Sequence, residues 1–258
     1  MKRIIYSIYT NTVNNHSSVN DFKKSQFEKY KKQIKKSQED YAKLCDADYK
    51  LYKTRIVDYD KIQFEKILLF EKLSKEYDEV LYFDFDVVPQ TRLNIFNEFD
   101  LNTICAYSLN RVVVEKTIRR KLVDDTFDRM NMWIKTCCKS AMLLLDDIQG
   151  SELLMNTGVL LGNRNSISKL KFSERLNKLN NKYSDAVKDN LYPEEINKWW
   201  KPNNEVYMSY LIERYNIPFT NIGLQWNFML DDYSPKPSSA AHILHHIRKE
   251  FELSFDEK

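Results

Sequence analysis

The stretch Leu81-Tyr82-Phe83-Asp84-Phe85-Asp86-Val87-Val88-Pro89 joins an apolar run to two acidic residues that lie two positions apart. The apolar run is typical of a buried strand, and in an extended chain residues i and i+2 point to the same side. Two carboxylates on one side can hold a hard cation such as Mn²⁺ or Mg²⁺ and leave positions open for two phosphate oxygens. The stretch therefore predicts a metal and diphosphate site at the end of a strand.

A simpler interpretation of Asp84 and Asp86 is that they cap the loop after the strand, as Asp often does. Phe85 between them and the apolar residues on both sides favour the metal site, because they fix the two acids to a buried element.

The residues before this stretch alternate between strand and helix patterns. Residues 4–9 and 49–51 are typical of strands, and residues 27–44 and 62–73 carry apolar side chains at helical spacing. This alternation predicts parallel strands joined by right-handed crossovers. Ligands bind beyond the carboxyl ends of such strands, where Asp84 and Asp86 lie.

The residues after this stretch predict a mixed sheet flanked by helices. Residues 104–107 and 157–161 are typical of strands, and residues 241–247 of a last short strand. One helix is expected to start at Ser166 or Ser168 and run toward Tyr183, and another to start at Asn203 or Asn204. Residues 111–150 give no clear assignment. We expect an α/β fold with a Rossmann-like, mixed and mostly parallel central sheet.

The composition limits the class of protein. A length of 258 residues with 43% hydrophobic residues, four Gly and six Pro fits a single folded domain without long linkers. The four cysteines lack zinc-type spacing, and no segment approaches the roughly 18 apolar residues of a membrane span, so a cytoplasmic location is expected. Seven lysines face two acidic residues in residues 21–36, which indicates a solvated helix face or a weak contact with an anionic membrane surface. We expect no nucleic-acid partner.

Two further motifs offer polar groups next to apolar elements. Asn156 begins an Asn-Thr-Gly triplet at the start of a strand, where Gly158 allows close backbone approach and Asn156 can bind sugar hydroxyls. Glu205 lies in the first turn of a helix, where it can contact hydroxyls or stabilise positive charge on a sugar. The alternatives are an ordinary turn for the triplet and a favourable helix-dipole position for Glu205.

A fourth motif, Ala241-His242-Ile243-Leu244-His245-His246-Ile247-Arg248-Lys249, holds three of the four histidines. In a strand these side chains alternate between faces, so one face can bring an imidazole to a metal. Arg248 and Lys249 can neutralise a diphosphate, although such cations are commonly just solvated.

In this order, the four motifs resemble the retaining glycosyltransferases of the GT-A fold, above all the glycogenin-like and galactosyl- or mannosyltransferase-like groups, over residues 4–249. The resemblance implies transfer of a sugar from a nucleoside-diphosphate sugar, a UDP-sugar rather than a GDP-sugar, to a hydroxyl of a glycan or glycoprotein acceptor. It implies Mn²⁺, or Mg²⁺, as the cofactor. It also implies that residues 1–90 are a nucleotide-binding half and that residues 91–258 bind the acceptor and close the metal site.

The resemblance also assigns roles to individual residues. Tyr9, Thr10 and Asn11 would line the nucleotide, Lys66 would approach the donor, and Arg248 and Lys249 would contact the donor's diphosphate. Asp84, Asp86 and His245 would bind the metal, and Asn156 and Glu205 would face the sugars. The sequence departs from the pattern after His245, where such families often have a glycine and this chain has Ile247-Arg248-Lys249. The choice between His245 and His246 and the phosphate contact therefore stay open.

Two other functions fit part of the sequence. The Asp-X-Asp strand also resembles the nucleophile motif of haloacid-dehalogenase-like phosphatases, in which Asp84 would be the nucleophile and Asp86 the acid and base. That family expects a later Gly-Asp metal site, and none of the four glycines precedes an Asp. A non-catalytic domain that binds a sugar nucleotide or a glycan is the second alternative.

Overall fold

The first 84 residues contribute three neighbouring parallel strands to the fold. The computed structural model describes residues 1–10, 18–54, 59–109, 127–189, 203–230, 234 and 236–256. Strand β1 (Arg3–Thr10) lies between β2 (Asp48–Thr54) and β3 (Glu79–Asp84), with parallel pairing on both sides. Because Ile8 pairs with Asp84, β1 and β3 end at the same edge of the sheet.

Three later strands complete a six-stranded sheet in the order β2-β1-β3-β6-β5-β7. Strand β6 (Met155–Asn163) runs antiparallel to β3 and to β5 (Ile104–Ser108), and β7 (Phe219–Asn221) runs parallel to β5. Three of the five pairings are therefore parallel, and the predicted mixed α/β fold is confirmed. The first residues of β6 lie at the edge where β3 ends.

A second, small sheet forms next to that edge. It has the order β4-β9-β8, with β4 at Val87–Pro89, β9 at Ile243–His245 and β8 at Phe228–Met229. The predicted last strand exists, but it is shorter than residues 241–247 and pairs outside the central sheet. Its antiparallel pairing with β4 puts His245 opposite Val87, directly after Asp86.

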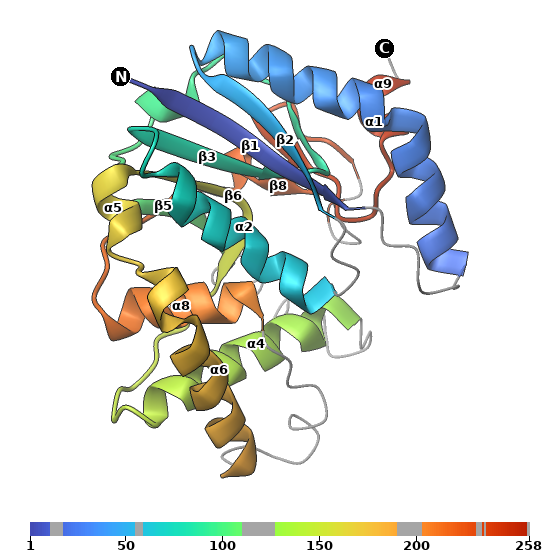
Figure 1. Cartoon of the computed structure of the whole chain (residues 1–258). Coiled ribbons are helices and arrows are strands. Elements are labelled where there is room, and N and C mark those ends of the chain that lie inside the picture. The colour runs from blue at the N-terminus through green and yellow to red at the C-terminus, as the bar shows by residue number, and fades with distance from the viewer. Residues whose placement is uncertain are drawn as a thin grey trace.

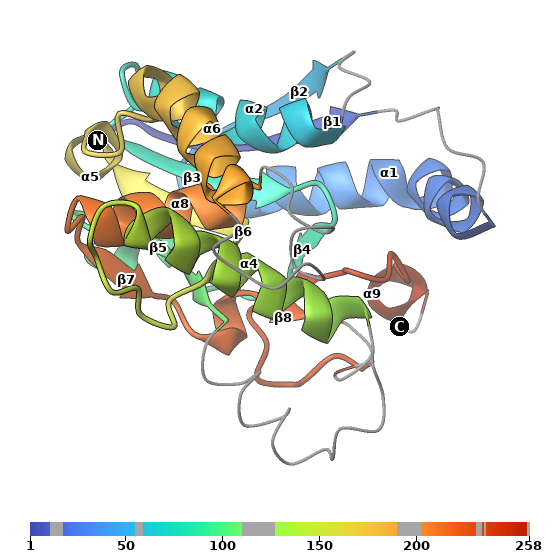
Figure 2. The ribbon, with the colours of Figure 1, turned by 90° about the horizontal axis from the view of Figure 1, so that it is seen from below.

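Helices cover both faces of the central sheet (Figures 1 and 2). The long helix α1 (Ser18–Leu44) packs on one face, and α2 (Tyr59–Leu73) packs on the other. The second face also carries α4 (Phe127–Leu144), α5 (Arg164–Ser168), α6 (Phe172–Lys188) and α8 (Asn204–Arg214). Short helices complete the described part at Ile95–Asn97, Leu224–Trp226 and Glu252–Phe255, the last being α9. No helix in the described ranges is long and apolar enough to cross a membrane.

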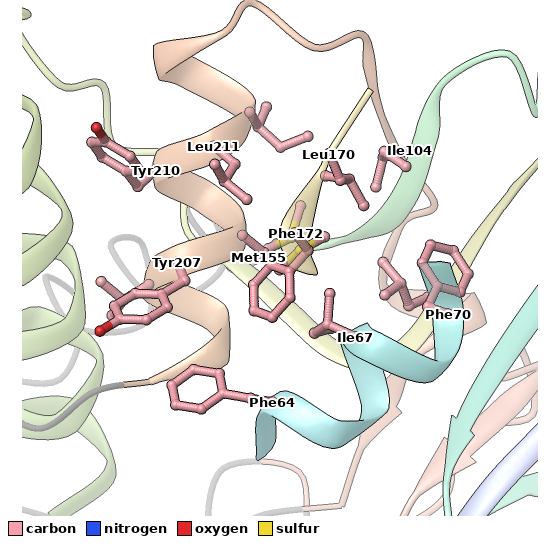
Figure 3. Packing of buried hydrophobic residues seen from close by; sticks show 14 of the residues in the cluster. Phe64, Ile67, Phe70, Ile104, Met155, Leu170, Phe172, Tyr207, Tyr210 and Leu211 are labelled. Carbon is pink, nitrogen blue, oxygen red and sulfur yellow. The ribbon is translucent and has the colours of Figure 1, made fainter. Parts of the chain in front are cut away.

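The larger core lies between the sheet and the helices of the second face. Ile4 and Tyr6 of β1 point into it, whereas the intervening Ile5 packs on the side of α1, as strand alternation requires. Figure 3 shows how the helices meet there: Phe64 of α2 stacks on Tyr207 of α8, with ring centroids 5.1 Å apart. This packing fixes the start of α8 relative to the sheet edge.

The helix starts agree only in part with the sequence prediction. Asn203 caps α8 by accepting hydrogen bonds from the backbone N–H of Glu205 and Val206, as expected. The expected single helix from Ser166 or Ser168 is wrong. Asn163 caps the short α5, with Ser166 as its partner in a capping box, and α6 begins separately after Lys171, whose φ is 43°. The reciprocal hydrogen bonds of Asn163 and Ser166 explain the earlier start.

Candidate metal centre

The two aspartates lie on a turn that is anchored on both sides. Asp84 is the last residue of β3, and Val87 opens β4. Phe85 points away into an aromatic cluster, where it is 5% exposed and packs against Tyr9 with ring centroids 4.9 Å apart. Because the intervening side chain is buried, the turn holds both carboxylates at the edge of the sheet.

His245 faces both carboxylates from the last residue of β9. Its Nε2 atom lies 3.8 Å from Asp84 Oδ2 and 3.5 Å from Asp86 Oδ1. Within the described ranges, this is the one group of three His, Cys, Asp or Glu ligand atoms that all lie within 4.8 Å of one another. These distances exceed normal hydrogen-bond lengths. Ligands about 2.1 Å from one octahedral cation are about 3 to 4 Å apart, so the donor set and its spacing fit Mn²⁺ or Mg²⁺.

The other oxygen of each carboxylate is held by cations and a hydroxyl. Asp84 Oδ1 accepts hydrogen bonds from Tyr82 Oη at 2.5 Å and from Lys66 Nζ at 3.2 Å, and Asp86 Oδ2 pairs with Lys249. Burial raises the pKa of Asp86, but the positive charge of Lys249, with the adjacent His245 ring, outweighs it and holds the pKa well below its usual range. Asp86 is therefore ionised at neutral pH.

Gly158 makes the close approach of His245 to β6 possible. A Cβ atom at residue 158 would lie 2.3 Å from His245 Cε1 and 2.7 Å from its Nδ1. Any side chain there would push the imidazole from its place.

A chain of buried polar side chains leads away from His245. Asn227 Oδ1 lies 3.0 Å from His245 Nδ1, and Asn227 Nδ2 donates to Asn156 Oδ1 at 2.8 Å. Asn156 Nδ2 donates to Glu205 Oε1 at 2.9 Å, and Glu205 Oε2 pairs with Lys135 at 2.6 Å. Asn156 and Glu205 thus come within one network with His245.

Sequence reasoning missed three members of this site. Strand periodicity could have predicted Tyr82, because it precedes Asp84 by two positions in the same strand and therefore lies on the same face. Asn227 and Lys135 follow no motif, and only the tertiary fold brings them to the site.

The remaining predicted residues are Tyr9, Thr10, Asn11 and Arg248. Tyr9 and Thr10 end β1 beside Asp84. The Lys31 ammonium lies over the Tyr9 ring, 3.6 Å from its centroid. Asn11 lies outside the described residues. Arg248 pairs with Glu250 at 2.8 Å.

His246 turns away from the aspartate side chains. Its Nε2 lies 2.8 Å from Ser254 Oγ and its Nδ1 3.0 Å from the backbone oxygen of Glu250. Burial lowers the pKa of His246 to about 4, which keeps the ring neutral at pH 7. Of the two adjacent histidines, the structure brings His245 to the carboxylates.

Residues 2–247 match the model of glycosyl transferase family 8. The chain belongs to this family. The family 8 chain is a glycosyltransferase with the GT-A fold, and this membership excludes the phosphatase alternative as its main activity. No curated protein matches its sequence significantly.

Solved structures are similar to this family 8 chain at low sequence identity. One is a glycosyltransferase involved in the glycosylation of the major capsid of PBCV-1, with 13% identity over 97% of this chain and 99% of that chain and a TM-score of 0.53. Others are the galactosyltransferase LgtC in complex with donor and acceptor sugar analogs, with 14% identity, 95% and 87% coverage and a TM-score of 0.46, and mouse xyloside xylosyltransferase 1, with 12% identity, 96% and 98% coverage and a TM-score of 0.43.

Proposed function

We propose that this glycosyltransferase moves a sugar from a nucleoside-diphosphate sugar to a hydroxyl of a glycan or glycoprotein, with retention of configuration. In this proposal Asp84, Asp86 and His245 bind Mn²⁺ or Mg²⁺, and the ion holds the diphosphate of the donor. The observation that carries the proposal is the spacing of Nε2 at 3.5 and 3.8 Å from one oxygen of each aspartate. Three ligand atoms that converge without a hydrogen bond between them suit a shared cation.

A bound divalent cation would stabilise the negative charge that develops on the departing diphosphate. The chain's own residues would supply position and further charge. Lys66 and Lys249 contact the outer oxygens of the two aspartates, which supports the proposal that their ammonium groups lie close to a diphosphate bound at this centre. Arg248, two residues after His246 in the chain, would add further positive charge near the diphosphate.

The edge of the sheet next to the metal centre would hold the nucleotide. Tyr9 and Thr10 end β1 beside Asp84, which supports the proposal that they line the nucleotide together with Asn11. Residues 1–90 would then form the nucleotide-binding half, and residues 91–258 the half that binds the acceptor and closes the metal site. A UDP-sugar is proposed over a GDP-sugar, as the resemblance of the motifs implies.

Asn156 and Glu205 would lie on the sugar side of the centre. Glu205 is 8% exposed at the start of α8, and its carboxylate links Asn156 to Lys135. In this place it can contact hydroxyls of donor or acceptor and stabilise positive charge that builds on the transferred sugar.

We also propose a cytoplasmic location. The four cysteines are free thiols, and three of them are buried. The lysine-rich face of α1 would make at most weak contact with an anionic surface, because Lys35 and Lys36 already pair with Glu39 and Asp40 along the helix.

Ligand-dependent unfolding tests the metal bridge. UDP at a hundred times its dissociation constant should raise the free energy of unfolding by about 2.7 kcal/mol in Mn²⁺, and far less in excess chelator. Equal stabilisation with and without the metal would contradict the bridge. GDP in place of UDP tests the choice of base.

Turnover separates the enzyme from a non-catalytic binding domain. A panel of nucleotide sugars should contain at least one donor from which the protein releases free nucleoside diphosphate in the presence of Mn²⁺. Tight binding of every donor without release from any would support the binding domain instead.

A further inference from the structure

The hydrogen bonds near His245 determine which atom is the oxygen and which is the nitrogen in the side-chain amides of Asn156 and Asn227. The backbone N–H of Gly158 donates to Asn156 at 2.9 Å, and a backbone nitrogen can only donate, so the atom it meets is the oxygen of that amide. Asn227 reaches the same oxygen at 2.8 Å and must present its Nδ2 there. The other amide atom of Asn227 is therefore its oxygen, 3.0 Å from His245 Nδ1.

An amide oxygen accepts hydrogen bonds and cannot donate them, so His245 Nδ1 carries a proton. In the neutral ring the lone pair is then on Nε2, the atom that faces Asp84 and Asp86. The other tautomer would set the Nδ1 lone pair against the Asn227 oxygen and lose a 3.0 Å hydrogen bond. In return, its Nε2 proton would meet carboxylate oxygens 3.5 and 3.8 Å away, which is too far for a normal hydrogen bond.

We propose that Asn227 is a positioning residue that holds His245 as the tautomer protonated on Nδ1 and so presents the Nε2 lone pair to the metal. The inference rests on the proposed metal centre for its function, although the tautomer itself can be measured without a metal. Residues that hydrogen-bond the second nitrogen of a metal-bound histidine commonly set its tautomer and orientation.

Burial makes this arrangement rigid. Asn227 is 0% exposed and His245 3% exposed, and the ring lies against Gly158. The chain of bonds continues through Asn156 to Glu205, so the orientation of the imidazole is tied to the two residues proposed to face the sugars. One network would therefore position both the metal ligand and the sugar side of the site.

The tautomer is read directly by ¹⁵N NMR of protein labelled at histidine, in excess chelator and at a pH where the ring is neutral. The chain has only four histidines, and His245→Gln assigns the signal. The wild type should show a protonated Nδ1. Asn227→Leu, which keeps the size but removes both amide groups, should move the proton toward Nε2. Asn227→Asp keeps an acceptor for Nδ1 and should restore the wild-type tautomer.

A second measurement connects the tautomer to the metal. Titration followed by electron paramagnetic resonance of free Mn²⁺ should show ten- to a hundredfold weaker binding for Asn227→Leu, the range typical of lost partners of metal ligands. Asn204→Leu is the matched control, because Asn204 is also a buried amide, bonded to Thr157 Oγ1 at 2.7 Å. That variant should leave the tautomer of His245 unchanged.

A wild-type ring protonated on Nε2 would overturn the inference, as would an Asn227→Leu variant with an unchanged tautomer and unchanged Mn²⁺ affinity. Absence of Mn²⁺ binding by the wild type would instead overturn the proposed function, and the NMR result would still decide the role of Asn227.

Discussion

Two buried clusters of charge in this molecule differ in how completely their members satisfy one another. Between α4 and α8, Lys139 is 0% exposed, pairs with Glu213 and donates to the backbone oxygens of Ser151 and Leu153 at 2.7 Å each. The three donors of its ammonium group are all used. At the metal centre, His245 Nε2 and two carboxylate oxygens converge at 3.5 and 3.8 Å without bonding to each other.

On the proposed function, the difference separates a structural cluster from a metal-binding one. A buried ion pair whose partners are all bonded fixes two helices and has no capacity left for a ligand. A group of converging ligand atoms is held in place by the protein around it and gains its full stabilisation when a cation joins it. The first cluster should therefore affect stability and the second activity, and variants can test that division.

The largest effect is expected from Glu213→Gln, which leaves the Lys139 ammonium buried without its carboxylate. Breaking a buried pair from one side commonly costs about 3–5 kcal/mol of unfolding free energy. Urea denaturation measures the loss, and the turnover of the folded fraction should stay near the wild-type value. The double variant Lys139→Met with Glu213→Leu should be more stable than the single one, because no charge remains buried. A loss below about 1 kcal/mol would remove this cluster's structural role.

Asp86→Asn should have the opposite pattern. It keeps the shape of the side chain and removes one charged ligand, so Mn²⁺-dependent transfer should fall by more than about a hundredfold, beyond the cost of losing an outer-shell partner. The urea midpoint should change less than in Glu213→Gln, which is the matched control, because Lys249 is 18% exposed and can reach water when its pair with Asp86 is broken, whereas Lys139 is fully buried. Near-normal transfer at limiting Mn²⁺ would remove Asp86 from the metal site, and Asp84→Asn tests the other ligand in the same way.

Local sequence patterns predicted the elements that carry the aspartates. The apolar runs of β1 and β3 and the helical spacing in α1 and α2 are signals within one element, so the parallel start of the sheet follows from sequence alone. The pairing of β9 with β4 in a separate sheet depends on contacts between residues far apart in the chain, and local sequence periodicity cannot predict such contacts. Asn227 reaches His245 through the same tertiary contacts, and its role was invisible for that reason.

Gly158→Ala tests how tightly the metal-binding cluster is held. The new methyl group would meet His245 Cε1 at 2.3 Å and displace the ring, so Mn²⁺ affinity should fall about tenfold or more, as when a ligand loses its orientation. Gly162→Ala on the same strand is the control, because its methyl group would meet Ser166 Oγ at 2.8 Å, away from the metal centre. Both variants should lose stability, and only Gly158→Ala should lose metal affinity. Equal Mn²⁺ affinity in the two would show that the ring has room to move.

The smallest effect concerns Asp146, which extends the structural comparison to partly exposed charge. It bonds Lys182 at 2.7 Å and Arg214 at 3.1 Å and accepts from Tyr210. Burial raises the pKa of Asp146, but the hydrogen bonds from Lys182 and Tyr210 outweigh it and lower the pKa below its usual value.

A carboxyl with a lowered pKa in the folded state stabilises the protein above its unfolded pKa of about 3.9, and this contribution is lost as the pH falls through the folded value. Asp146→Asn should therefore cost about 1 kcal/mol at pH 7, the scale of one charged hydrogen bond after screening, and less at pH 3. Urea denaturation at both pH values measures the change. Asp185→Asn is the control, because Asp185 is 58% exposed and its ion pair with Lys188 is long at 3.9 Å. This variant should cost no measurable stability at either pH. A cost for Asp146→Asn that is the same at pH 7 and pH 3 would mean that the charge of Asp146 adds no stability and that its side chain contributes through shape and packing alone.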